Sequence, residues 1–168
     1  MLDIPSISAI VAAAGVLVGV VIAVIELRNL VKQRQSDLVM RLYSDWGSEE
    51  IQKAVGTVVE LEFKDYDDYV GKYGSPPSRG VFEDIWKVAW FFNGVGVLVQ
   101  SKLADVELID KLFGYMILGI WEGLEPIVGG FKKQSTPGMR RALEWFEYLY
   151  NEMKKREQKL RQAGVRNG

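Results

Sequence analysis

An uncharged run of twenty residues, from Ser6 to Ile25, constrains this chain more than any other feature of its sequence. At about 1.5 Å of rise per residue, a helix of this length is roughly 30 Å long, which is the thickness of the hydrocarbon core of a bilayer. A single segment in lipid satisfies its backbone N–H and C=O groups only as a helix. We therefore predict a membrane-spanning helix here.

Two alternatives to a membrane span are a cleaved signal peptide and the core helix of a soluble protein. A signal peptide normally begins with basic residues, has a shorter apolar run and ends in a cleavage site of small residues. This chain has Asp3 but no Lys or Arg before the run, and the charged residues Glu26 and Arg28 follow the run directly. These features favour a span that stays attached and contacts the lipid bilayer.

The basic residues that flank the run predict its orientation. Arg28, Lys32, Arg34 and Arg41 follow the run, whereas no basic residue precedes it. Basic flanking residues stay on the cytoplasmic side of a membrane. We therefore expect a single-pass protein of the cell membrane, with its N-terminus outside and the rest of the chain in the cytoplasm.

Small residues recur at a spacing of four within the run, at Gly15, Gly19 and Ala23. This spacing places them on one helix face, where small side chains let a second helix approach closely. The pattern predicts a homo-oligomer, although small residues are also common in spans that do not associate.

The helical pattern continues beyond the run, because no Gly or Pro interrupts it before Gly47. A polar stripe on this continuation contains Glu26, Asn29, Gln33 and Ser36. One interpretation is the solvated face of an amphipathic stalk. The alternative is a pore within a ring of helices, in which Glu26, Asn29 and Gln33 would line the pathway and attract cations.

The remainder of the chain predicts further helices and no strand, because its apolar residues recur with helical rather than alternating spacing. Ser48 is the predicted cap of the first of these helices, Pro126 is expected to kink or restart one, and Thr136-Pro137 is expected to begin the last. The predicted helices are 48–63, 64–69, 79–101, 105–131 and 136–162, with a Pro-rich loop at 75–78. The expected fold is all-α: one N-terminal transmembrane helix with a stalk at 1–46, connecting helices and the loop at 47–77, a cytoplasmic helical bundle at 78–162 and a frayed tail at 163–168.

Composition limits the chemistry that this chain can perform. It contains no Cys and no His, which excludes disulfides, thiol nucleophiles, imidazole acid–base catalysis and the usual zinc sites. The net charge of −1, from 21 basic and 22 acidic residues, argues against nucleic-acid binding. We therefore expect no cofactor, no catalytic residue and no metal site.

Three weaker signals each have an ordinary explanation. The run Asp65-Tyr66-Asp67-Asp68 begins like a calcium loop but loses the pattern afterwards, so that a solvated acidic turn is the simpler interpretation. Glu122 and Glu125 are spaced like an acid–base pair of a hydrolase, or could form salt bridges with Arg140 or Arg141. The basic tract 154–161 either complements the dipole at a helix end or contacts anionic lipid.

The assembled pattern resembles an uncharacterised prokaryotic family, a domain of unknown function with one N-terminal span and a cytoplasmic helical domain. The resemblance rests on the core residues at 91–99 (FFNGVGVLV), 108–114 (LIDKLFG) and 121–122 (WE). It implies no activity and no functional residue. The sequence thus predicts a membrane-anchored, self-associating interaction module without catalytic activity, and the alternative is a homo-oligomeric ion channel.

Overall fold

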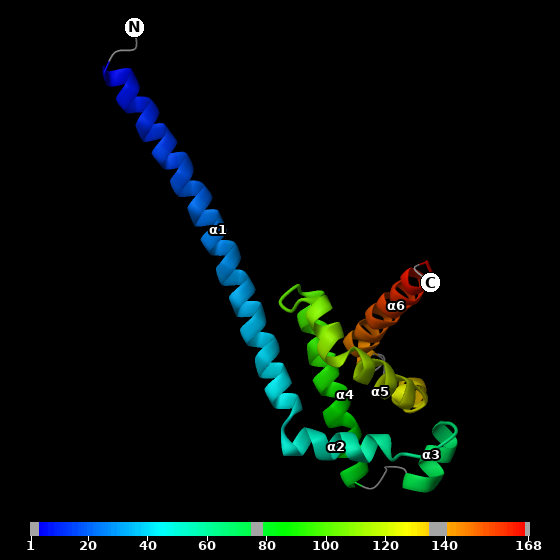
Figure 1. Ribbon diagram of the computed structural model, residues 1–168. Helices are drawn as coiled ribbons and strands as arrows, with labels where there is room; N and C mark the ends of the chain where they lie inside the picture. The colour runs from blue at the N-terminus through cyan, green and yellow to red at the C-terminus, as the bar shows by residue number, and fades with distance from the viewer. Residues whose placement is uncertain (1–3, 75–78, 135–140, 167–168) are drawn as a thin grey trace. The chain divides into compact units, whose positions relative to one another are not determined.

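The computed structural model describes residues 4–74, 79–134 and 141–166 of the chain (Figure 1). These residues form helices and contain no strand, so that the predicted all-α class is confirmed. The helices are α1 (Ile4–Trp46), α2 (Glu49–Val59), α3 (Tyr66–Tyr73), α4 (Arg79–Gln100), α5 (Val106–Gln134) and α6 (Glu144–Arg166).

The chain divides into two compact units, Met1–Leu38 and Val39–Gly168. The division falls inside α1 and therefore earlier than the expected boundary at residue 46. Val39 is already buried, and Leu42 and Trp46 pack against the core of the second unit. The last two turns of α1 therefore belong to the bundle.

The first unit is a single helix, and it runs without interruption through the predicted span. Every side chain from Ala12 to Arg34 is exposed. The helix continues through the polar residues that follow Ile25, as the absence of Gly and Pro predicted.

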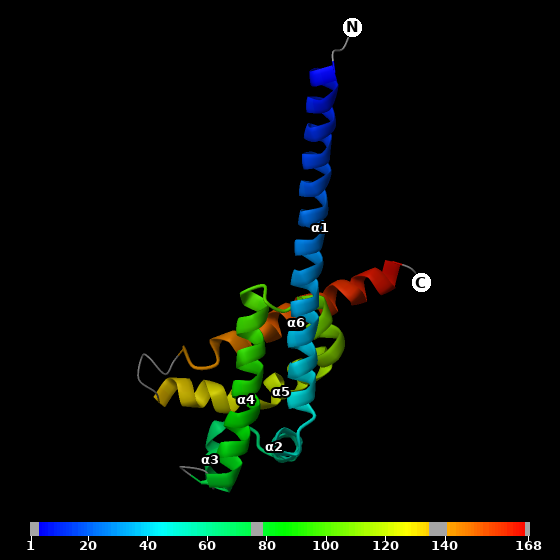
Figure 2. The same ribbon diagram turned by 90° about the vertical axis from the view of Figure 1, so that its left-hand side faces the viewer.

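The second unit is built around aromatic side chains. Helix α4 packs against α6 and α2, and α5 packs against α6 (Figure 2). The Trp46 ring contacts Phe92 and Phe113, and the Phe92 ring stacks on Phe146 at 5.2 Å between centroids. Phe92, Phe113 and Phe146 are fully buried, so this cluster forms the centre of the core.

Helices α4 and α6 approach each other closely at Gly96. A Cβ on Gly96 would overlap the backbone carbonyl of Trp145 on α6, so only glycine fits there. One turn earlier on α4, the Asn93 Oδ1 accepts hydrogen bonds from the backbone N–H groups of Trp145 and Phe146, both at 3.2 Å. Asn93 therefore caps the first turn of a helix that lies about fifty residues later in the sequence.

The start of α6 differs from the prediction. The helix was expected from Thr136-Pro137, which lies outside the described residues, but α6 begins only at Glu144. Leu143, just before it, has a left-handed backbone with φ of 66° and is buried, so the chain turns there before the helix starts. At its other end α6 extends to Arg166, beyond the expected limit of 162, and residues 167–168 of the expected frayed tail lie outside the described residues.

The connecting helices also differ in their limits. Ser48 caps α2, as predicted, by accepting from the Ile51 N–H. However, α2 ends at Val59 rather than at residue 63, and Val59 is 69% exposed although helical spacing predicts it on the apolar face of this helix. Helix α3 begins after Asp65, whose side chain caps it, rather than at residue 64.

Pro126 lies within α5, which continues past it to Gln134. The predicted restart of the helix at this proline is therefore wrong. Ile117 and Leu124 on α5 and Leu149 and Met153 on α6 are buried in the core.

Candidate functional site

The exposed apolar surface of α1 is the first candidate site. The described part of α1 from Ala12 contains a segment long and apolar enough to cross a membrane. Val16 and Leu17 are each 67% exposed, and Val21 and Ile25 remain more than half exposed. Soluble monomeric proteins rarely expose a continuous apolar surface of this size, and such surfaces mark contacts with membranes or with other proteins.

The predicted self-association residues lie on this surface. A Cβ on Gly15 or on Gly19 would meet no atom within 4 Å, and Ala23 is exposed. The three residues follow one another at intervals of one turn and therefore share a face of α1. This face has room for the backbone of a second helix.

The predicted pore-lining residues Glu26, Asn29 and Gln33 are all exposed on α1. Their spacings of three and four place them on one face of the helix. Because they belong to a single helix, a pathway that they line would need several copies of the chain.

Glu122, one of the two glutamates considered as an acid–base pair, is hydrogen-bonded to α6. The Tyr150 hydroxyl donates to Glu122 Oε1 at 3.2 Å, and Lys154 Nζ donates to the same hydroxyl at 2.8 Å. The expected salt bridge with Arg141 is wrong, because Arg141 pairs with Glu144 at 2.9 Å on the same turn. The other expected partner, Arg140, lies outside the described residues.

The acidic turn before α3 uses its carboxylates for capping. Asp65 Oδ1 accepts from the Asp68 N–H at 2.9 Å, and Asp68 Oδ2 accepts from the Lys64 N–H at 2.9 Å. That hydrogen bond, together with the Lys72 ammonium 3.2 Å away, lowers the pKa of Asp68. Within the described ranges, no group of three or more His, Cys, Asp or Glu side chains is arranged to hold a metal ion.

The basic tract of α6 is largely paired within the chain. Lys155 bridges to Glu152 at 2.8 Å and Arg161 to Glu157 at 2.6 Å. Arg156 reaches Asp110 on α5 at 3.0 Å and so links two helices of the bundle. These ion pairs therefore hold most of the basic tract within the second unit.

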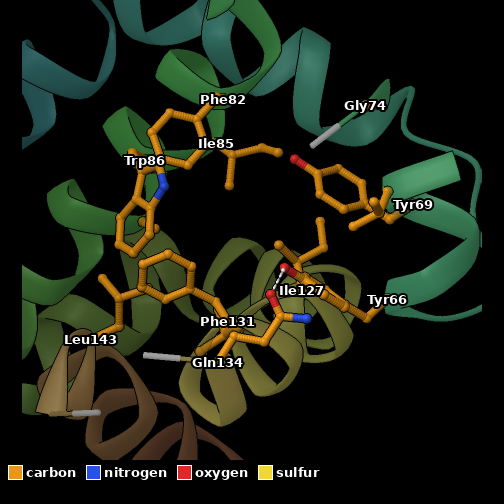
Figure 3. Close-up of a pocket in the computed structure, with 13 residues that line it drawn as sticks. Tyr66, Tyr69, Gly74, Phe82, Ile85, Trp86, Ile127, Phe131, Gln134 and Leu143 are labelled. Carbon is orange, nitrogen blue, oxygen red and sulfur yellow. Dashed lines mark hydrogen bonds between the residues drawn. The ribbon is translucent and has the colours of Figure 1, made fainter. Parts of the chain in front are cut away.

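A cavity of about 420 Å³ lies between α3, α4 and α5 and was not predicted (Figure 3). Its walls are mostly aromatic and aliphatic side chains, and none of the described residues that line it is charged. Helical spacing predicts Phe82 and Trp86 on an apolar face that packs into the core, whereas both line this cavity and Phe82 is 37% exposed. The one available signal was the density of Tyr, Phe and Trp in these segments, which core packing explains equally well.

Comparison with known proteins places the chain in a family. Residues 9–153 match the family described as Domain of unknown function (DUF4760). The chain belongs to this family. The resemblance stated from the residues at 91–99, 108–114 and 121–122 is thereby confirmed, and the DUF4760 match covers α2 to α5 completely, most of α1 and the N-terminal part of α6 up to residue 153. The chain matches no functionally curated protein and no solved structure.

Proposed function

We propose that this member of the DUF4760 family is a membrane-anchored, self-associating helical interaction module that performs no catalysis itself. The observation that carries the proposal is the exposure of every side chain from Ala12 to Ile25 in a segment without charge. Eight large apolar residues are exposed between Val16 and Ile25. At about 0.3–0.6 kcal/mol each, they favour insertion into lipid by roughly 2–5 kcal/mol.

The basic residues after the span support a cytoplasmic location for the bundle. The absence of cysteine makes this orientation testable, because one introduced cysteine is the only thiol. We would label Asp3→Cys and Asn151→Cys variants in intact cells with a membrane-impermeant maleimide, because position 3 precedes the uncharged run. The proposal expects labelling at position 3 and protection at position 151 until the cells are opened, whereas the reverse pattern would refute the orientation.

Cleavage as a signal sequence is the main competitor of the anchor. The intact mass of the protein purified from membranes distinguishes the two, because removal of the run shortens the chain by more than twenty residues. Resistance of the full-length chain to extraction by alkaline carbonate supports the anchor. A shortened chain that alkaline carbonate releases from the membrane would exclude it.

Self-association is supported by the open face at Gly15 and Gly19. A leucine at either position would keep the helices apart, so Gly15→Leu and Gly19→Leu should weaken association by about tenfold, equivalent to about 1.4 kcal/mol. Ala13→Leu is the matched control, since residue 13 lies on a different face of α1. Energy transfer between labelled copies in liposomes measures the association, and equal effects of all three substitutions would contradict this interface.

The number of subunits separates the module from the alternative channel. A dimer has no lumen between its two helices, whereas a ring of four or more leaves room for one. The exposure of Glu26, Asn29 and Gln33 on one face of α1 is the feature that favours the channel. The mass of the detergent-solubilised assembly is the first measurement, and for a ring the cation flux of Glu26→Gln in liposomes is the second.

A further inference from the structure

Beyond this proposed function, the cavity between α3, α4 and α5 has the features of a binding site. Five aromatic rings surround it, from Tyr66, Tyr69, Phe82, Trp86 and Phe131 (Figure 3). The cavity volume of about 420 Å³ lies in the range that small ligands occupy. Aromatic walls favour flat apolar groups, because rings pack against one another in stacked or edge-to-face arrangements.

The packing around the cavity holds its walls in place. The Tyr66 ring lies directly on Gly130 of α5, where a Cβ would overlap it, and its hydroxyl bonds to Gln134 Oε1 at 3.2 Å. On the opposite side, the Trp86 ring contacts Phe82 and Phe131 edge-on, with centroids 5.7 and 5.1 Å apart. The cavity is therefore bounded by side chains that have fixed partners.

Two hydrogen-bond donors face the cavity without an acceptor. Figure 3 shows the Tyr69 hydroxyl and the indole nitrogen of Trp86 on the cavity side of their rings. Neither group has a hydrogen-bond partner among the described residues, although Tyr69 is only 3% exposed. Each fully buried polar side-chain atom in the described ranges does have a partner, so these two atoms are not fully buried.

Burial keeps the Tyr69 hydroxyl protonated. It raises the pKa of Tyr69 to about 12, with smaller contributions from Tyr66 and Tyr73. At neutral pH the hydroxyl is therefore available as a donor. A ligand that placed an acceptor there would gain a hydrogen bond inside a largely apolar cavity.

We propose that this cavity binds an uncharged, flat aromatic molecule whose carbonyl oxygen accepts a hydrogen bond from Tyr69 and whose ring lies beside the Trp86 indole. A charged ligand is disfavoured because no charged side chain among the described lining residues would compensate its desolvation. A pure hydrocarbon fits the walls but leaves both donors without an acceptor. The carbonyl compound is therefore the preferred occupant.

The test uses the full chain in phosphatidylcholine nanodiscs, with its five tryptophans labelled by ¹⁵N at the indole nitrogen. Propiophenone is the probe, and n-propylbenzene is the matched hydrocarbon without a carbonyl group. The expected result is a saturable shift of the Trp86 indole signal, which a Trp86→Phe spectrum assigns. The signals of Trp46 and Trp121 report any unspecific effect of probe dissolved in the lipid.

Two conservative variants test the hydrogen bond. Tyr69→Phe should weaken propiophenone binding about three- to tenfold and leave propylbenzene binding unchanged. Tyr73→Phe is the control, because the Tyr73 hydroxyl does not line the cavity and accepts instead from the Glu62 N–H. The indole spectrum of each variant without probe verifies that the bundle is folded.

Each outcome decides the proposal. Selective, saturable binding of the ketone that Tyr69→Phe weakens supports it. Equal affinity for propiophenone and propylbenzene in the wild-type protein would overturn the assigned ligand class, and this comparison needs no variant. Absence of a saturable shift at Trp86 would overturn the site altogether.

Discussion

Replacement of Asn93 by leucine should show how much of the stability of the bundle depends on a cap between two helices. Asn93 is 7% exposed, and its Oδ1 is the acceptor for two N–H groups at the start of α6. Leucine branches at the same carbon and has as many side-chain heavy atoms, but it offers no acceptor. The substitution therefore removes both hydrogen bonds and keeps the position filled.

The expected loss follows from the two donors left behind. A buried donor without a partner costs about 1–3 kcal/mol. The Phe146 N–H is buried and bears this cost in full, whereas the Trp145 N–H is partly buried and bears about half. The sum is about 2–4 kcal/mol, which lowers the melting temperature of a domain of this size by roughly 6–12 °C.

Thermal unfolding in detergent, followed by near-ultraviolet circular dichroism, measures the loss. Asn93→Asp retains an acceptor and should recover part of the stability, while Asn151→Ala on the exposed side of α6 should change the free energy of unfolding by less than about 0.5 kcal/mol. Hydrogen exchange of the Trp145 and Phe146 amides should accelerate in Asn93→Leu. Wild-type melting together with unchanged protection of both amides would show that the cap contributes nothing.

Two further predictions concern glycines and the aromatic cavity. Gly96→Ala should destabilise the bundle by about 1–3 kcal/mol, since the new methyl group meets the backbone of α6. Gly94→Ala lies on an open face of the same helix and should stabilise the bundle by about 0.5–1 kcal/mol. Denaturant titration of both variants measures these opposite changes in the free energy of unfolding. Because the pKa of Tyr69 is about 12 in the folded chain and 10.0 in an unfolded one, the free energy of unfolding should fall by about 2–3 kcal/mol as the pH rises from 10 to 12. Tyr69→Phe should lack this part of the alkaline loss, and an identical alkaline loss in both proteins would refute the assignment.

Local signals predicted the helices well. The Ser48 cap was predicted from one residue and its neighbours, because capping depends on atoms within a single turn. The continuity of α1 was likewise predictable, because no Gly or Pro lies between Val20 and Trp46. Such features act over a few neighbouring residues and can therefore be predicted from the sequence alone.

The extent of burial around each helix was harder to predict. Periodicity placed Phe82, Trp90 and Val97 within or beside an apolar face of α4, yet Trp90 is 50% exposed and the other two are more than a third exposed. The apolar stripe on α4 is wider than the surface that α2, α5 and α6 cover. Which part of a stripe is covered depends on the positions of the other helices, and helical spacing alone does not define these positions.

Contacts between distant residues were not predictable from the pattern. The start of α6 depends on Asn93, which lies 52 residues before Trp145, and on the left-handed backbone of Leu143. A leucine rarely adopts this conformation, so nothing in the sequence marks the turn. Thr136-Pro137 is a typical local sequence for the start of a helix, but tertiary packing decides where the described helix begins.

Both units contain large apolar side chains, but these side chains are buried in the second unit and exposed in the first. In the second unit, Phe92, Phe113 and Phe146 lose almost all contact with water because helices of the same chain cover them. In the first, Val16 and Leu17 are each 67% exposed although they are no less apolar in character. Removing such side chains from water is favourable by about 1.5–3 kcal/mol each, and within the first unit no other side chain covers them. Lipid covers the whole circumference of a helix, and a second copy covers only the face of small residues, which is why the anchor and the self-association are compatible proposals rather than competing ones.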